Sequence, residues 1–212
     1  MNLQFVSKKV GKLGNIVVQG TSGRESVELG KDIEVSHAAF VSGMEALNQI
    51  KQPFYISAGT ALGIIRDNRF IAHDQDIDVE IVSSYKNPVN HEAIIKSFYE
   101  HGFILVRTMH DESFPQQLAF INNDDVIFDI WFVYTDVEEG YGVTFSDLGR
   151  MKTPVKFIRD MKKSSWIVDG KEYIVRLPNK PEEYCEMRYG SDWRTPKKYK
   201  GPWQDDAGNL EL

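Results

Sequence analysis

An acidic residue lies in the middle of the most apolar stretch of the chain, and this feature constrains the fold more than any other. Residues 126–133 read Val-Ile-Phe-Asp-Ile-Trp-Phe-Val, with Asp129 surrounded by apolar neighbours. Such a run predicts a strand buried inside a sheet. An ionised carboxylate in that position costs several kcal/mol unless it is paired or bound to a metal. Asp129 therefore predicts either a structural ion pair or hydrogen bond, or a metal ligand.

Two further acids, Asp76 and Asp78, stand two residues apart in a stretch that alternates acidic and apolar residues. On a strand these side chains share one face, about 7 Å apart. Carboxylates that close repel each other unless a cation lies between them, and hard divalent cations prefer oxygen ligands. A solvated acidic strand edge is the alternative for the pair alone. Together with Asp129 on a neighbouring strand, the pair predicts a site for Mg²⁺ or Mn²⁺.

A short segment before the acidic pair has the composition of a phosphate-binding turn. Residues 54–57 read as a strand, and Gly59 and Thr60 follow at the start of a short helical run. A glycine permits close approach of the backbone, and a helix N-terminus favours phosphate. Arg66 is the candidate to neutralise that phosphate. His73 is a candidate to deprotonate an acceptor hydroxyl, with a surface histidine as the alternative.

Helix signals recur along the chain. Ser36 is a candidate N-cap for a helix that ends before Pro53, and Asn90 is a candidate N-cap for a helix that runs to Gly102 as its C′ residue. Residues 181–189 predict a short helix with proline in its first turn.

The strands and helices together predict a mixed α/β (α+β) fold, in which helices flank a mixed β-sheet. We expect one domain over residues 1–212. Within it, an N-terminal hairpin covers about residues 1–20 and an appended C-terminal region covers about residues 150–212. Strands at 117–121 and 126–134 surround a turn of Asn-Asn-Asp.

Bulk properties exclude several classes of protein. The formal net charge of −6 argues against non-specific nucleic-acid binding. Cys185 is the single cysteine, so no internal disulfide can form, and we expect a structural thiol rather than a nucleophile. The sequence contains no secretory signal and no apolar run of about 20 residues, so a membrane span is not expected. We therefore expect a cytoplasmic protein, whose oligomeric state the sequence leaves open.

Two motifs resemble the LicD/fukutin family of the nucleotidyltransferase fold. The first comprises residues 59–66, 70–71 and 74–78, which read GTALGIIR, FI and DQDID. The second comprises residues 177–184 and 188–196, which read LPNKPEEY and RYGSDWRTP. The resemblance covers roughly residues 54–196 and is weaker between 82 and 125. Ala72, His73 and Gln75 depart from the family pattern, in which a Pro-Trp pair and another acid occupy these places.

The resemblance implies an enzyme that transfers a phospho-alcohol, such as phosphocholine or ribitol phosphate, from a CDP-linked donor to a sugar or glycan hydroxyl. It implies that Asp76, Asp78 and Asp129 hold the metal and that Gly59, Thr60 and Arg66 contact the phosphate. Nucleotidyl transfer from an NTP would use the same carboxylates, so it stays open as an alternative. A non-catalytic nucleotide-binding module is a third possibility, against which the buried Asp129 counts. The sequence does not identify the donor alcohol or the acceptor.

Overall fold

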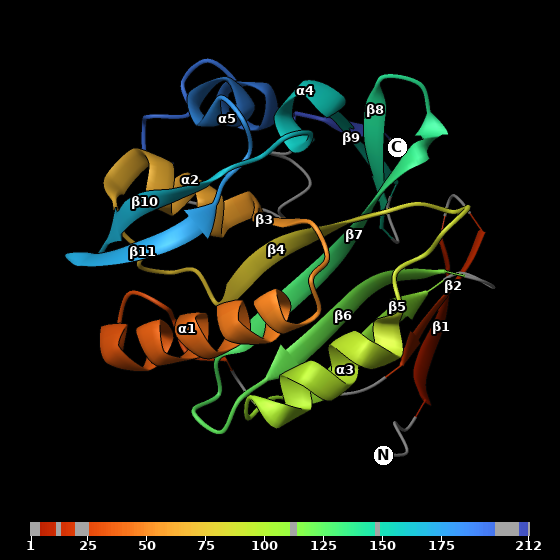
Figure 1. The fold of residues 1–212 in the computed structure, drawn as a ribbon, viewed down its shortest axis with the longest axis horizontal. Coiled ribbons are helices and arrows are strands. Elements are labelled where there is room, and N and C mark those ends of the chain that lie inside the picture. The colour runs from red at the N-terminus through yellow and green to blue at the C-terminus, as the bar shows by residue number, and fades with distance from the viewer. Residues whose placement is uncertain are drawn as a thin grey trace.

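A long mixed β-sheet with helices on both faces forms the core of the computed structural model (Figure 1). The structure describes residues 5–11, 14–19, 26–110, 114–146, 149–197 and 208–211, with side chains described from residue 26 onward. Within these ranges the strands are β1 (Phe5–Gly11), β2 (Gly14–Gln19), β3 (Phe54–Ile56), β4 (Asp76–Ser83), β5 (Ile104–His110), β6 (Pro115–Ile121), β7 (Ile127–Glu138), β8 (Tyr141–Phe145), β9 (Arg150–Pro154), β10 (Lys163–Val168), β11 (Lys171–Arg176) and β12 (Leu210–Glu211). The helices are α1 (Ile33–Gln49), α2 (Ala58–Asp67), α3 (His91–Glu100), α4 (Val155–Ile158) and α5 (Pro181–Tyr189).

The strand β7 lies at the centre of the sheet. The order is β1-β2-β5-β6-β7-β8-β9-β12, and β4 joins β7 from the side while β3 pairs with β4. The β4–β7 pair is parallel, and the other described pairs are antiparallel. The α/β fold class with a mixed sheet and flanking helices is thus confirmed. Because β4 and β7 run in the same direction, their N-terminal ends lie side by side, with Asp76 paired with Ile127.

The helices α1 and α3 cover one face of the sheet and lie side by side (Figure 1). The Ser97 hydroxyl on α3 donates a hydrogen bond to the Ala46 carbonyl on α1, at 2.9 Å. Phe128 of β7 packs so tightly against Gly43 that a Cβ on this glycine would lie 2.1 Å from the Phe128 ring. The Phe98 ring of α3 packs edge-on against the Phe128 ring, with 5.2 Å between the ring centres. This apolar packing assigns the alternate residues of β7, including Asp129, to the opposite face.

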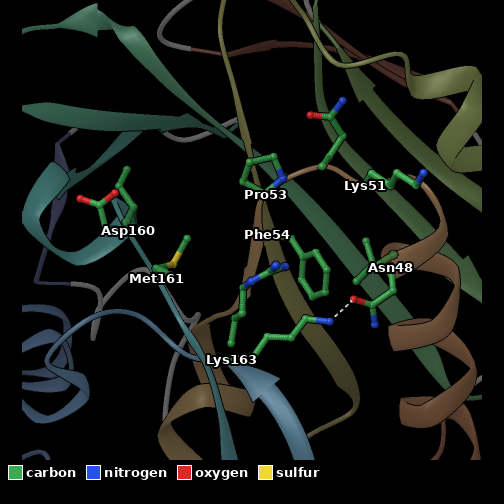
Figure 2. A pocket seen from close by; sticks show the side chains of 11 residues that line it. Asn48, Lys51, Pro53, Phe54, Asp160, Met161 and Lys163 are labelled. Carbon is green, nitrogen blue, oxygen red and sulfur yellow. Dashed lines mark hydrogen bonds between the residues drawn. The ribbon is translucent and has the colours of Figure 1, made fainter.

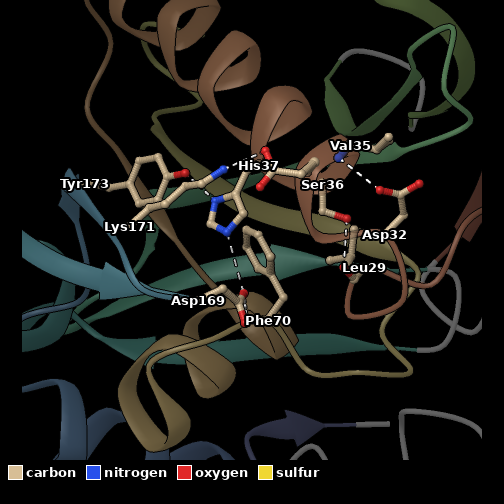
Figure 3. Close-up of polar contacts among 10 residues, drawn as sticks. Leu29, Asp32, Val35, Ser36, His37, Phe70, Asp169, Lys171 and Tyr173 are labelled. Carbon is tan, nitrogen blue, oxygen red and sulfur yellow. Dashed lines mark hydrogen bonds and ion pairs between the residues drawn. The ribbon is translucent and has the colours of Figure 1, made fainter.

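The β10–β11 hairpin lies between α1 and the end of α2, and a buried polar cluster connects it to both (Figure 3). The His37 imidazole of α1 stacks on the Tyr173 ring at 5.3 Å, and its Nδ1 is hydrogen-bonded to the Tyr173 hydroxyl. Asp169 Oδ2 lies 3.8 Å from His37 Nε2 and accepts a hydrogen bond from the Phe70 N–H. Burial lowers the pKa of His37, so a neutral ring fits this packed position.

The predicted helix ends are correct at α3 and α5 but not at the start of α1. Asn90 caps α3 by accepting bonds from two backbone N–H groups, and Gly102 follows this helix with φ of +86°. Asp32 rather than Ser36 is the N-cap of α1, because Asp32 accepts from the Val35 N–H. Ser36 lies inside the helix, and its hydroxyl donates to the Leu29 carbonyl.

The C-terminal third contributes to the main sheet as well as to a separate region. The strands β8, β9 and β12 extend the sheet beyond β7. The β10–β11 hairpin and α5 instead lie over the β3–β4 end of the molecule (Figure 1). Among the helices in the described ranges, none is long and apolar enough to cross a membrane.

Candidate metal and active site

The three predicted acids converge at one place in the structure. Asp78 and Asp129 are direct neighbours in the parallel β4–β7 ladder, and Asp76 lies two residues earlier on the same face of β4. One carboxylate oxygen from each of the three lies within 4.8 Å of the others. This grouping is what the alternating pattern on β4 and the lone acid on β7 predicted.

Asp129 has both a structural partner and a free oxygen. Its Oδ2 accepts hydrogen bonds from Arg107 Nη2 at 2.9 Å and from Gln117 Nε2 at 2.6 Å. Its Oδ1 is buried and has no hydrogen-bond partner among the described residues. Asp129 therefore combines both predicted roles: one oxygen forms an ion pair, and the other is an acceptor without a partner in the described part of the chain.

The electrostatics of the cluster are those of crowded, buried carboxylates. Burial raises the pKa of Asp129 to about 7, although the Arg107 guanidinium opposes the rise. Burial and the nearby Asp76 charge raise the pKa of Asp78 well above its ordinary value. Burial and mutual repulsion disfavour the charged forms of these groups, so a divalent ion is the natural partner for their charged forms. The donor set, its spacing and the orphaned Asp129 oxygen all fit a hard cation such as Mg²⁺.

A fourth acid, Asp74, closes one side of the cluster and was not assigned a role from the sequence. Its Oδ2 is buried without a hydrogen-bond partner in the described part of the chain, and burial followed by the Asp76 charge raises its pKa. A Cβ on Gly59 would lie 2.5 Å from this oxygen. Gly59 is thus required at this place because the Asp74 carboxylate packs against its α-carbon. The sequence signal for Asp74 is its place two residues before Asp76.

Gly59 lies in the first turn of α2, directly beside the acids. Ser57 is the N-cap of α2 but makes no side-chain cap bond, so the first N–H groups of the helix are not capped by it. Free N–H groups at a helix start are suited to hold an anionic oxygen. The predicted phosphate contact through the backbone at Gly59 therefore has the right location and stays a prediction.

The prediction that the Thr60 hydroxyl contacts phosphate stays a prediction, and in this structure the hydroxyl has partners within the protein. Thr60 is fully buried, and its Oγ1 accepts a hydrogen bond from the Asp78 N–H at 2.9 Å. The same hydroxyl lies 3.5 Å from the Asp76 carbonyl oxygen, to which it donates. Thr60 therefore positions the backbone of β4 between the two acids, because a buried N–H needs an acceptor.

The prediction that Arg66 neutralises the phosphate also stays a prediction, and in this structure the side chain pairs with Asp67. Arg66 follows Ala58 by eight residues, which places it about 12 Å along the helix. Its Nε and Nη2 both donate to Asp67 Oδ2, at 2.9 and 2.7 Å. The structure thus provides Arg107 on β5, rather than Arg66, as the guanidinium in contact with the acids.

His73 lies in the exposed turn between α2 and β4, directly before Asp74. Its location at the rim of the cluster is compatible with the predicted contact to an acceptor, and that role stays a prediction.

A second charged group lies behind the acids and connects β4 to the C-terminal motif. Glu80 continues the acidic face of β4 but is buried, and its Oε1 lies 3.7 Å from Arg188 Nη1. The Tyr55 hydroxyl donates to Glu80 Oε2. Burial raises the pKa of Glu80, and the Arg188 charge opposes that rise. The sequence carried Arg188 in the second motif and Glu80 beside the first, but nothing in it indicated that the two meet.

Curated proteins and a solved structure are similar to the chain. The ribitol-5-phosphate transferases FKTN of Macaca fascicularis and Homo sapiens are each 30% identical to the chain over 171 residues, which cover 79% of this chain and 34% of the relative. The chain therefore spans about a third of the length of these relatives. Among solved structures, the lincomycin-bound lincosamide antibiotic adenylyltransferase LnuA is similar with a TM-score of 0.44 and 10% identity, over 68% of this chain and 81% of that one.

The family model described as LicD/FKTN/FKRP, nucleotidyltransferase domain, matches residues 51–169. This match covers more than half of the chain and includes all of the acids described above. The predicted family is confirmed, and the chain belongs to the LicD/FKTN/FKRP nucleotidyltransferase-domain family.

Proposed function

We propose that the chain is a divalent-metal-dependent transferase that moves a phospho-alcohol group from a CDP-linked donor to a sugar or glycan hydroxyl. The observation that carries the proposal is the convergence of Asp76, Asp78 and Asp129 from two parallel neighbouring strands. Family membership and the fukutin relatives named as ribitol-5-phosphate transferases support the phospho-alcohol as the group transferred. The donor nucleotide, the metal and the cytoplasmic location of the protein stay predictions.

In this proposal the acids hold Mg²⁺ or Mn²⁺, which supplies charge neutralisation at the phosphate oxygens when bound. The unsatisfied Oδ1 of Asp129 and the carboxylates of Asp76 and Asp78 are the ligands. Arg107 and Gln117 hold the other oxygen of Asp129, so its ligand oxygen is kept at a fixed angle.

The other residues of the site bind and orient the substrates. The backbone at Gly59, in the first turn of α2, holds a phosphate oxygen of the donor. The acceptor hydroxyl oxygen forms a bond to the phosphorus that carries the alcohol, and the bond from that phosphorus to the CMP oxygen breaks. In this proposal His73, exposed in the turn directly before Asp74, accepts the proton that the acceptor hydroxyl loses.

Nucleotidyl transfer from an NTP is the alternative, and the family model's own description as a nucleotidyltransferase domain favours keeping it. The two reactions differ in the product released: CMP in the first and pyrophosphate in the second.

The test separates the two reactions and locates the site. The protein is incubated with Mg²⁺ and a sugar acceptor panel, together with CDP-ribitol, CDP-choline or one of the four NTPs, and the released nucleotide is analysed. CMP released together with a modified acceptor is expected, and pyrophosphate from an NTP would replace the proposal with the alternative. Asp76→Asn should abolish turnover, whereas Asp124→Asn, an exposed acid in the β6–β7 turn, should not. Equal turnover in both variants would remove the acids from the mechanism.

A further inference from the structure

A cavity of about 500 Å³ lies between the end of α1, the start of β3 and the β10–β11 hairpin (Figure 2). It is separate from the acids. Phe54 in its wall pairs with Ile81, three residues beyond Asp78 on β4, which is a separation of about 10 Å along the strand. The lining combines an apolar floor with polar and charged walls. These residues are Leu47, Asn48, Lys51, Gln52, Pro53, Phe54, Ile158, Asp160, Met161, Lys163 and Arg176.

The charge of this cavity is opposite to that of the chain. Three cations, Lys51, Lys163 and Arg176, line it against one carboxylate, Asp160, although the net charge of the protein is −6. Within the described ranges, none of the three cations forms an ion pair, whereas elsewhere Lys152, for example, contacts two carboxylates. Unpaired cations around a concave surface attract anions and gain the most when one binds.

The cavity also has an apolar wall that a bare ion would leave uncovered. The Arg176 guanidinium lies over the Phe54 ring, 5.4 Å from its centre, and is thereby held in place. Lys163 Nζ donates to Asn48 Oδ1 at 2.7 Å, as Figure 2 shows, which leaves its other two N–H groups for a ligand. Pro53 and Met161 complete the apolar side.

We infer that this cavity is a binding site for a sugar-sized ligand that carries an anionic group, a phosphate or a carboxylate. The anion contacts Arg176 and Lys163, and the body of the ligand packs on Phe54 and Pro53. The site is independent of the metal cluster, and the inference goes beyond the transfer reaction proposed above.

Calorimetry on the whole chain in EDTA tests the inference, with glucose 6-phosphate, glucuronate and glucose as probes. Binding of glucose 6-phosphate or glucuronate, with no binding of glucose, is expected. The anion that binds identifies the group as phosphate or carboxylate. Absence of binding by both anions, or equal binding of glucose, would overturn the inference.

Matched variants locate the binding. Arg176→Met and Lys163→Met should each weaken anion binding by about tenfold, because each removes one charge-assisted contact. Lys162→Met, an exposed neighbour that does not line the cavity, should leave the affinity unchanged. A melting temperature measured for each variant shows that the fold is retained. Asp78→Asn should also leave anion binding unchanged, so failure of the transferase proposal and failure of this one give different results. Equal loss in Lys162→Met and Lys163→Met, or loss in Asp78→Asn, would place the anion elsewhere and refute the site.

Discussion

The buried pair of Glu80 and Arg188 gives a quantitative test of how the C-terminal motif is held to the sheet. Both side chains are almost fully buried, with 3% and 7% of their surfaces exposed, and their charged atoms are 3.7 Å apart. Two unit charges at this distance attract by about 4 kcal/mol at an effective dielectric constant of about 20. Desolvation of both ions offsets much of that gain, so the pair's net contribution is smaller than the attraction.

Removing only one partner leaves the other charge buried without compensation, which destabilises the folded state. Arg188→Met keeps a similar side-chain length but leaves the Glu80 carboxylate buried with only the Tyr55 hydroxyl as a partner. We expect a loss of about 3–5 kcal/mol in the free energy of unfolding. Glu80→Gln should also destabilise the protein, because Arg188 then loses its carboxylate partner and keeps weaker contacts to the Tyr184 hydroxyl at 3.5 Å, the Met151 sulfur at 3.8 Å and the Tyr189 ring at 5.9 Å.

The double variant distinguishes an ion pair from two independent packing effects. Removing both charges should cost less than the sum of the single variants by about 1–3 kcal/mol, measured in urea unfolding of all four proteins. Additive losses, or a cost below about 1 kcal/mol for Arg188→Met, would refute the assignment of this pair as the connection between β4 and α5.

Other changes test the metal site and its supports. Asp129→Asn should weaken Mg²⁺ binding in calorimetry by on the order of tenfold or more, and unchanged affinity would leave Asp129 as the partner of Arg107 alone. The metal-free protein should lose stability as pH rises from about 4 to about 7, because burial raises the pKa of Asp129 to about 7 and the folded state keeps a proton that the unfolded state releases. Added Mg²⁺ should reduce that loss in thermal melting, and a stability independent of both pH and Mg²⁺ would contradict the assignment. Thr60→Val should lower the free energy of unfolding in urea by about 1–3 kcal/mol, because the Asp78 N–H loses its acceptor. Thr60→Ser keeps the hydroxyl and should retain most of the stability. Equal losses in the two variants would indicate that Thr60 stabilises the fold by packing instead. Cys185 is buried and burial raises its pKa to about 12, so it should resist iodoacetamide until the protein is unfolded, and rapid alkylation of the native protein would contradict this.

The acids were predictable because their pattern is local or energetically costly. Alternation on a strand places Asp76 and Asp78 on one face wherever that strand lies in the fold. A carboxylate in an apolar run, such as Asp129, requires a partner in any fold. Neither inference needed knowledge of which strands are neighbours.

The supports of the site were not predictable, because they depend on contacts between distant segments. Arg107 and Gln117 reach Asp129 only after β5, β6 and β7 pair in their observed registers. The role predicted for Arg66 also depends on the fold, because the rise of an α-helix places this residue about 12 Å along α2 from Ala58. The distance of a side chain from the start of its helix depends on where the helix begins, and the motif alone does not give that position.

The register of β7 connects the apolar core to the chemistry of the acids. Adjacent residues on a strand point to opposite faces, so a slip of one residue would turn Asp129 toward α1 and α3 and bring Phe128 to the acids. Phe128 fits against Gly43, where a Cβ would lie 2.1 Å from its ring, and no carboxylate would find a partner in that apolar contact. The glycine on α1 therefore fixes which face of β7 carries its carboxylate. The parallel pairing then sets Asp129 beside Asp78. Packing on one face of the sheet therefore determines the geometry of the candidate ligands on the other face.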